Sequence, residues 1–100
     1  MGTRQPLSVV WSAASVRRLQ AAFDYLEGES SGTARKTWRR IVEAVRRIGQ
    51  LPQSGHPGRI AGTREAAVPR TPYTVVYQVT VQRIEILSIW NTAHLWPEPF

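Results

Sequence analysis

The sequence predicts an α+β fold with two layers, in which a helical hairpin packs on one face of a β-sheet. Apolar residues recur every three or four positions from residue 16 to residue 48, and every two positions from residue 73 to residue 90. The first period is typical of amphipathic helices and the second of half-buried strands. A Gly- and Pro-rich segment, residues 52–63, separates the two halves. We therefore expect the order β-α-α-β-β-β in a single domain that spans residues 1–100.

The first helix follows a short strand at residues 7–11. Ser12 is a suitable N-cap, because its hydroxyl can accept a hydrogen bond from a free backbone N–H of the first turn. We expect this helix to end near Gly28, since glycine is favoured just after a helix. Its apolar stripe consists of Val16, Leu19, Phe23 and Leu26.

The second helix is expected to start with Thr33 as its N-cap and to end at Gly49 and Pro52. A link of about five residues between two amphipathic helices implies an antiparallel hairpin. The apolar face of this helix consists of Trp38, Ile41, Val42, Val45 and Ile48.

Three strands should follow the loop at residues 52–63. The strand at residues 64–70 suits an edge position, because prolines bracket its end. Residues 73–81 and 84–90 form a hairpin that turns at Gln82-Arg83. One face of this hairpin should carry Tyr73, Val75, Tyr77, Val79 and Val81, and one face of its second strand should carry Ile84, Ile86, Ser88 and Trp90.

The composition excludes several classes of protein. Hydrophobic residues make up 42% of the chain and charged residues 20%, which is typical of a globular domain. There are no cysteines, so disulfides and thiolate metal sites are excluded, and His56 and His94 stand alone. No apolar run is long enough for a membrane span, and the first residues do not resemble a secretory signal. We expect no metal, no cofactor and no membrane contact.

The net charge of +6 indicates an acidic partner. All but one of the 13 basic residues are Arg, the exception being Lys36. Arginine binds carboxylates and phosphates through two parallel hydrogen bonds, so an acidic protein or a nucleic acid would suit this surface.

Six strings, in this order, resemble one family of proteins. They are VVWSAAS, FDYLEGES, IGQLPQSGHPGR, GTRE, PYTVVYQV and IEILSIWNTAHLWP, and the resemblance extends over nearly the whole chain, roughly residues 8–97. In this arrangement they resemble the ParE branch of the RelE/ParE toxin superfamily. Members of this superfamily are the toxins of bacterial type II toxin–antitoxin modules, which stabilise plasmids.

The resemblance implies a fold and two partners. In the family the first strand lies beside the last, which implies the strand order 1-4-3-2 in a mainly antiparallel sheet. ParE-like members inhibit DNA gyrase by binding and are not known to need a catalytic site. A ParD-like antitoxin, with a flexible and acidic C-terminal segment, would neutralise the protein. A chain without cysteines suits a reducing compartment, so we expect the protein in the bacterial cytoplasm.

RelE-like members of the superfamily instead cut messenger RNA on the ribosome. Here Thr74 stands where their pattern carries an Arg, and Asn91 and His94 replace the His and Arg of a terminal His-x-x-Arg motif. Asparagine cannot act as an acid or a base. The sequence therefore favours a binding inhibitor. If the protein is a nuclease, the candidate catalytic residues are Arg64, Arg83 and His94. A non-toxic relative that only binds a partner is the other alternative.

Two sets of residues are candidates for binding. A basic stripe on the second helix is the expected antitoxin site, and it consists of Lys36, Arg39, Arg40, Arg46 and Arg47. The expected target site consists of Arg59, Arg64, Asn91, His94 and Trp96. Trp96 can either anchor a partner or cover the end of the sheet. Arg59 and Arg64, with Glu65, can also form an ion pair that holds the long loop to the sheet.

Overall fold

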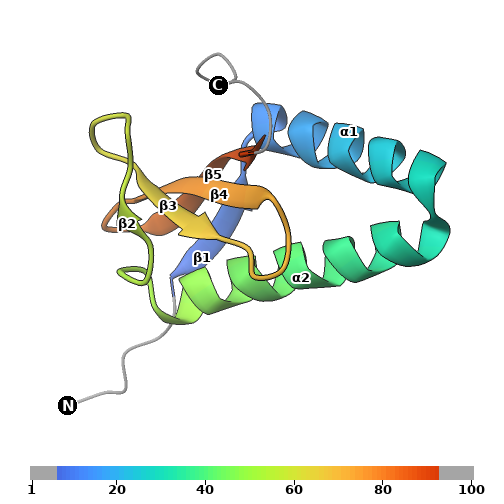
Figure 1. The fold of residues 1–100 in the computed structure, drawn as a ribbon. Helices are drawn as coiled ribbons and strands as arrows, with labels where there is room; N and C mark the ends of the chain where they lie inside the picture. The colour runs from blue at the N-terminus through green and yellow to red at the C-terminus, as the bar shows by residue number, and fades with distance from the viewer. Residues whose placement is uncertain (1–6, 93–100) are drawn as a thin grey trace.

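The predicted α+β class is confirmed. The computed structural model describes residues 7–92, and Figure 1 shows a helical hairpin packed against a twisted sheet. The elements are β1 (Ser8–Trp11), α1 (Ala13–Glu29), α2 (Ser31–Gln50), β2 (His56–Pro57), β3 (Arg64–Ala67), β4 (Tyr73–Val79) and β5 (Arg83–Asn91). The two helices join far from the sheet, so the hairpin extends beyond the layer that it covers (Figure 1).

The sheet has the order β1-β5-β4-β3-β2. The four expected strands therefore keep their expected order, with β1 beside β5. β1 runs parallel to β5, whereas the other neighbouring strands are antiparallel. The fifth strand, β2, corrects the expectation that residues 52–63 form only a loop. His56 and Pro57 pair with Glu65 and Arg64, which extends the sheet by a short edge.

The helix boundaries differ from the expected ones around Ser30. Ser12 caps α1 as expected, accepting a hydrogen bond from the Ser15 N–H at 3.0 Å. α2, however, is capped by Ser30 and not by Thr33, whose N–H donates to the Ser30 hydroxyl at 3.4 Å. The Ser30 N–H also bonds Leu26 O at 2.8 Å, which closes α1. A single residue therefore ends one helix and caps the next, and Gly28 remains inside α1.

A β-bulge in β5 changes which side chains face the helices. Val76 pairs with Ser88 whereas Tyr77 pairs with Ile86, so Leu87 is an extra residue. The Leu87 carbonyl accepts a hydrogen bond from the Ser12 hydroxyl at 3.2 Å. An extra residue reverses the alternation of side chains beyond it. The expectation that Ser88 and Trp90 share a face with Ile84 and Ile86 is therefore wrong, and Ile89 joins the core instead.

The core lies between α2 and the helix-facing side of the sheet. Its members come from α2, from the β3–β4 turn and from β4 and β5; they are Ile41, Val45, Ile48, Val68, Tyr73, Val75, Tyr77, Ile84, Ile86 and Ile89. Four residues expected in the apolar stripes are exposed instead, namely Val16, Trp38, Val42 and Val81. Trp38 and Val42 lie at the edge of the α2 stripe, and Val81 lies in the turn between β4 and β5.

Candidate functional site

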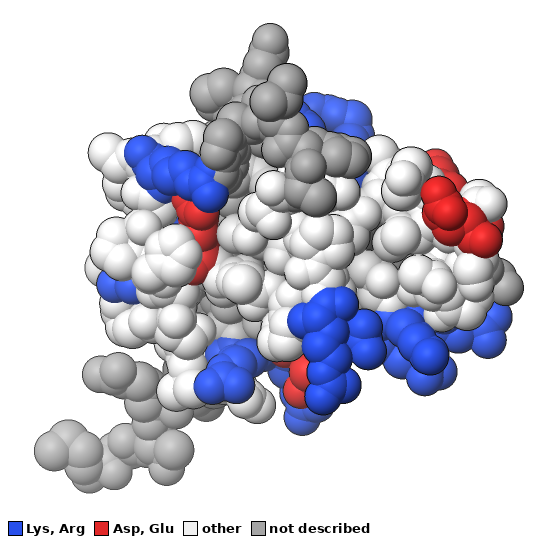
Figure 2. All heavy atoms as spheres, in the orientation of Figure 1, with Lys and Arg blue, Asp and Glu red and all other residues white. Residues whose placement is uncertain are grey.

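The largest group of basic side chains lies on the outer side of α2. Figure 2 shows Lys and Arg side chains along the lower edge of the molecule, over α2, while acidic side chains gather near the far end of α1. The five predicted members of this basic stripe are Lys36, Arg39, Arg40, Arg46 and Arg47, of which Arg40 is partly buried and the others are exposed. The helix thus presents its core residues to the sheet and its cations to solvent.

Glu43 is the one acidic residue within this stripe. It lies 3.7 Å from the Arg46 guanidinium, and both side chains are more than two-thirds exposed. Exposed pairs of this kind contribute little to stability. The pair nevertheless offsets the charge of Arg46, so the net positive charge of the stripe comes from the remaining four cations.

A groove runs between the second half of α2 and the turn that joins β3 to β4. Its volume is about 440 Å³. Arg40 and Arg47 line it from the helix, and Arg70 lines it from the turn. The Arg40 Nη1 atom donates to Arg70 O at 3.4 Å, which connects the two walls. The sequence places Arg70 far from α2, so only the fold brings this third arginine to the stripe.

A second cleft lies between the two helices and has a volume of about 400 Å³. Its aromatic wall is formed by Phe23 and Trp38, whose rings meet edge to face with centroids 5.8 Å apart. Gln20, Glu27 and Arg35 complete it. This cleft was not predicted, because Trp38 was expected in the apolar face that packs on the sheet. Arg35 and Trp38 lie three positions apart and therefore on the same side of α2, which was the signal available in the sequence.

The predicted ion pair between the long loop and the sheet is present. Glu65 is 2% exposed and lies 3.7 Å from the Arg59 Nε atom. The same carboxylate accepts a hydrogen bond from the Arg59 N–H at 2.9 Å. Arg64 donates to Gly55 O at 2.5 Å and to the Gln53 side chain. Both arginines of the expected target site therefore hold the loop at residues 52–63 against the sheet.

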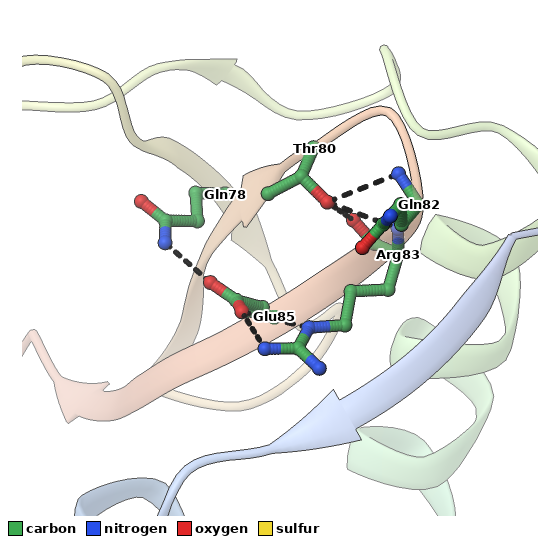
Figure 3. A network of polar contacts seen from close by, with 5 residues as sticks. All are labelled: Gln78, Thr80, Gln82, Arg83 and Glu85. Atoms are coloured by element: carbon green, nitrogen blue, oxygen red, sulfur yellow. Dashed lines mark hydrogen bonds and ion pairs between the residues drawn. The ribbon is translucent and has the colours of Figure 1, made fainter.

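Arg83 belongs to a polar network at the β4–β5 turn (Figure 3). Its guanidinium contacts the Glu85 carboxylate at 2.7 and 2.8 Å, and Gln78 donates to the same carboxylate at 2.5 Å. Hydrogen bonds from Gln78 and then from Arg83 hold the pKa of Glu85 below its ordinary value. The Thr80 hydroxyl accepts the N–H groups of Gln82 and Arg83, which fixes the turn.

The structure does not bring Arg64 and Arg83 together on one face of the sheet. Arg64 pairs with Tyr77 on the helix-facing side, whereas Arg83 flanks the core residue Ile84 and points to the opposite side with Glu85. Asn91 is half-buried at the end of β5, where it pairs with Tyr73. His94 and Trp96, the other predicted site residues, lie outside the described residues.

Within residues 7–92 no three His, Asp or Glu side chains gather closely enough to hold a metal ion. No helix in that part of the chain is long and apolar enough to span a bilayer.

Comparison with known proteins assigns the family. Residues 9–96 match the family described as ParE toxin of type II toxin–antitoxin system, parDE. A protein of Sinorhizobium fredii named "Putative toxin Y4kP" is 33% identical over 88 residues, which cover 88% of this chain and 91% of that protein. The structure also resembles a chain of the chromosomal ParDE toxin–antitoxin system from P. aeruginosa, with a TM-score of 0.78 and 26% identity over 85% of this chain and 95% of that one. The protein therefore belongs to the ParE toxins of type II toxin–antitoxin systems.

Proposed function

We propose that this ParE toxin inhibits DNA gyrase by binding and that a ParD-like antitoxin with an acidic C-terminal segment neutralises it. The match to the ParE family over residues 9–96 is the observation that carries this proposal. The module would act in the bacterial cytoplasm and would stabilise the replicon that encodes it. No cofactor is needed, because inhibition by binding requires no chemistry from the toxin.

The surroundings of the candidate catalytic residues support a binding mechanism. Ribonucleases need an acid, a base and a cation that reach the same phosphodiester. Arg64 is bonded to the loop at residues 52–63, and Arg83 is bonded to Glu85 on the other side of the sheet. Thr74, at a position where RelE-like enzymes carry an arginine, is buried and cannot titrate. Both arginines are therefore bonded to other groups of the protein, whereas a nuclease would need them to contact the phosphate of the RNA.

The proposed antitoxin site is the basic stripe of Lys36, Arg39, Arg40, Arg46 and Arg47. An acidic segment would form charge-assisted hydrogen bonds there, which give orientation and a fast association rate as well as affinity. The proposed target site comprises Arg59 in the loop at residues 52–63, Arg64 beside that loop at the start of β3, Asn91 at the end of β5, and His94 and Trp96. The antitoxin would then neutralise the toxin either by extending from the stripe over the target site or by changing access to that site.

The proposal is tested first in growing bacteria. Expression of the toxin is induced, and DNA and protein synthesis are followed separately by pulse labelling. We expect DNA synthesis to stop first and cells to form filaments. The purified protein should then inhibit supercoiling by gyrase in a dose-dependent manner. Early loss of protein synthesis, with cleavage of ribosome-bound mRNA and intact supercoiling, would refute gyrase as the target and support the nuclease. Normal growth would indicate a non-toxic relative.

A further inference from the structure

We propose that the groove between α2 and the β3–β4 turn, named here the α2–turn groove, binds an acidic segment of a protein chain that carries carboxylates beside apolar side chains. Its lining combines three arginines and three apolar residues with one carboxylate and one amide. These residues are Arg40, Arg47 and Arg70, then Ala44, Leu51 and Pro69, and finally Glu43 and Gln50. The inference rests on the proposed function for the source of the segment, which would be the antitoxin. The groove, the contribution of Arg70 and the need for apolar side chains in the ligand go beyond the basic stripe of α2.

The three arginines are available to a ligand. Among the described residues, none of them forms an ion pair, and Glu43, the acidic residue of the lining, is paired with Arg46. Arg40 donates only to a neutral carbonyl, that of Arg70. The Gln50 side chain adds a further hydrogen-bonding group to the lining. Three guanidinium groups around one groove repel each other, so a carboxylate placed among them relieves this repulsion as it forms hydrogen bonds.

Arg70 has an unfavourable backbone conformation. Its φ is 63°, and no other described non-glycine residue has a positive φ. The Thr71 N–H bonds Val68 O at 3.2 Å, so Pro69 and Arg70 are the central residues of a β-turn. Proline followed by a residue with positive φ is the pattern of a type II turn, in which glycine or asparagine is favoured at the second central position. A strained residue of this kind points to a role for the side chain that the turn itself does not require.

The apolar residues of the groove select a protein segment over a nucleic acid. Leu51 is 54% exposed, and it lies with Ala44 and Pro69 beside the arginines. A phosphodiester backbone would satisfy the arginines but would offer these residues no apolar partner. A peptide with alternating acidic and apolar side chains can contact both the arginines and the apolar residues of the groove. The volume of about 440 Å³ accommodates several side chains, as expected for a short segment and not for an isolated ion.

Arg70→Gly provides a test that separates binding from stability. Glycine adopts the positive φ of this position without strain, so the variant loses the guanidinium while its melting temperature stays equal or rises. Arg17→Ala on the exposed side of α1 is the matched control, since it removes the same charge outside the groove. The probe is a short fluorescein-labelled peptide of alternating Glu and Leu, and its binding to the full chain is measured by anisotropy at low salt.

We expect Arg70→Gly to weaken binding of this peptide about tenfold, and Arg17→Ala to weaken it by less than about threefold. A peptide of alternating Glu and Ser should bind the wild-type protein more weakly than the Glu and Leu peptide. The inference is overturned if the wild-type protein does not bind the peptide, or if Arg70→Gly and Arg17→Ala bind it equally. It is also overturned if Arg70→Gly weakens the binding of duplex DNA and leaves the binding of the peptide unchanged.

The outcome is separable from that of the proposed function. If Arg70→Gly loses peptide binding while the wild-type protein does not inhibit gyrase, peptide binding by the groove is supported and the proposed target is wrong. If the wild-type protein inhibits gyrase but does not bind the peptide, the proposed target is supported and the proposal for the groove is wrong. In cells, Arg70→Gly should remain toxic but need more antitoxin for neutralisation than the wild-type toxin does.

Discussion

The Tyr77 hydroxyl joins the centre of the sheet to the long loop that follows α2. It accepts a hydrogen bond from the Gly55 N–H at 2.8 Å and donates one to Pro52 O at 2.8 Å. The Tyr77 side chain is fully buried, so its ring fills the core while its hydroxyl satisfies two backbone groups of the loop. The same loop carries Gln53, Gly55 and Arg59, which bond Arg64 and Glu65 of β3. One tyrosine therefore connects the core to the proposed target site.

Tyr77→Phe should lower the free energy of unfolding by about 1–3 kcal/mol, because the buried Gly55 N–H and Pro52 carbonyl lose their partner. The change is measured by urea unfolding followed by circular dichroism. Hydrogen exchange should accelerate selectively at residues 52–63, since the ring still fills the core. Equal stability of the variant and the wild-type protein would show that the loop is held without this contact.

Gly55→Ala should also be destabilising. A Cβ atom at this position would lie 2.6 Å from the Tyr77 Oη atom and 2.9 Å from Glu65 O, and the second contact is with backbone. We expect a loss of about 1–3 kcal/mol, as for other insertions into packed sites. Gly28→Ala is the control, because nothing lies within 4 Å of the added atom and alanine favours helix. Thermal unfolding should show opposite shifts for the two variants.

Trp38→Ala should have a smaller effect than a core substitution. Trp38 is 42% exposed and contacts Phe23 edge to face, so its removal should cost about 1–2 kcal/mol. Ile41→Ala, one turn further along the same helix and 1% exposed, should cost about 2–5 kcal/mol. Urea unfolding of both variants measures the difference. A loss of 3 kcal/mol or more for Trp38→Ala, which is about the value for a buried tryptophan, would contradict its exposed position.

Glu85→Gln should change how stability depends on pH. A carboxyl whose pKa is lower in the folded state stabilises the fold above its ordinary pKa, and this contribution is lost as the pH falls through the folded-state value. The hydrogen bonds from Gln78 and Arg83 lower the pKa of Glu85 in this way (Figure 3). Unfolding in urea, measured from neutral pH down to acidic pH, should therefore show a smaller acid-induced loss for Glu85→Gln. Glu43→Gln, on the exposed side of α2, is the control, and an equal effect of both variants would contradict the role of the network.

Much of the fold could be predicted because the relevant signals are local. The spacing of Ile41, Val45 and Ile48 defines a helix whatever it packs against, and the alternation of Tyr73, Val75 and Tyr77 defines a strand. The cap at Ser12 also depends on its immediate neighbours alone. The prediction of an acidic partner also rests on composition alone, namely the net charge and the arginine content. The resemblance to ParE toxins, carried by six short strings, gave the strand order around β5.

The errors have two different sources. The cap of α2 is a local one: Ser30 and Thr33 are both suitable caps and lie three positions apart, so residue preference alone does not choose Ser30. The second source is contact between distant residues. The extra residue Leu87 turns the side chains of Ser88 and Trp90 to the opposite face of the sheet. Such a bulge depends on how β5 pairs with β4, so the pattern of apolar residues within β5 does not reveal it.

The sequence by itself determined the two helices and every strand except β2, most residues of the core, and the basic side of α2. Only the tertiary structure decided that Trp38 lies at a cleft and that Arg70 joins Arg40 and Arg47 in one groove. The physical reason is that periodicity describes the faces of a single element, whereas a binding groove depends on which faces of separate elements the packing leaves uncovered.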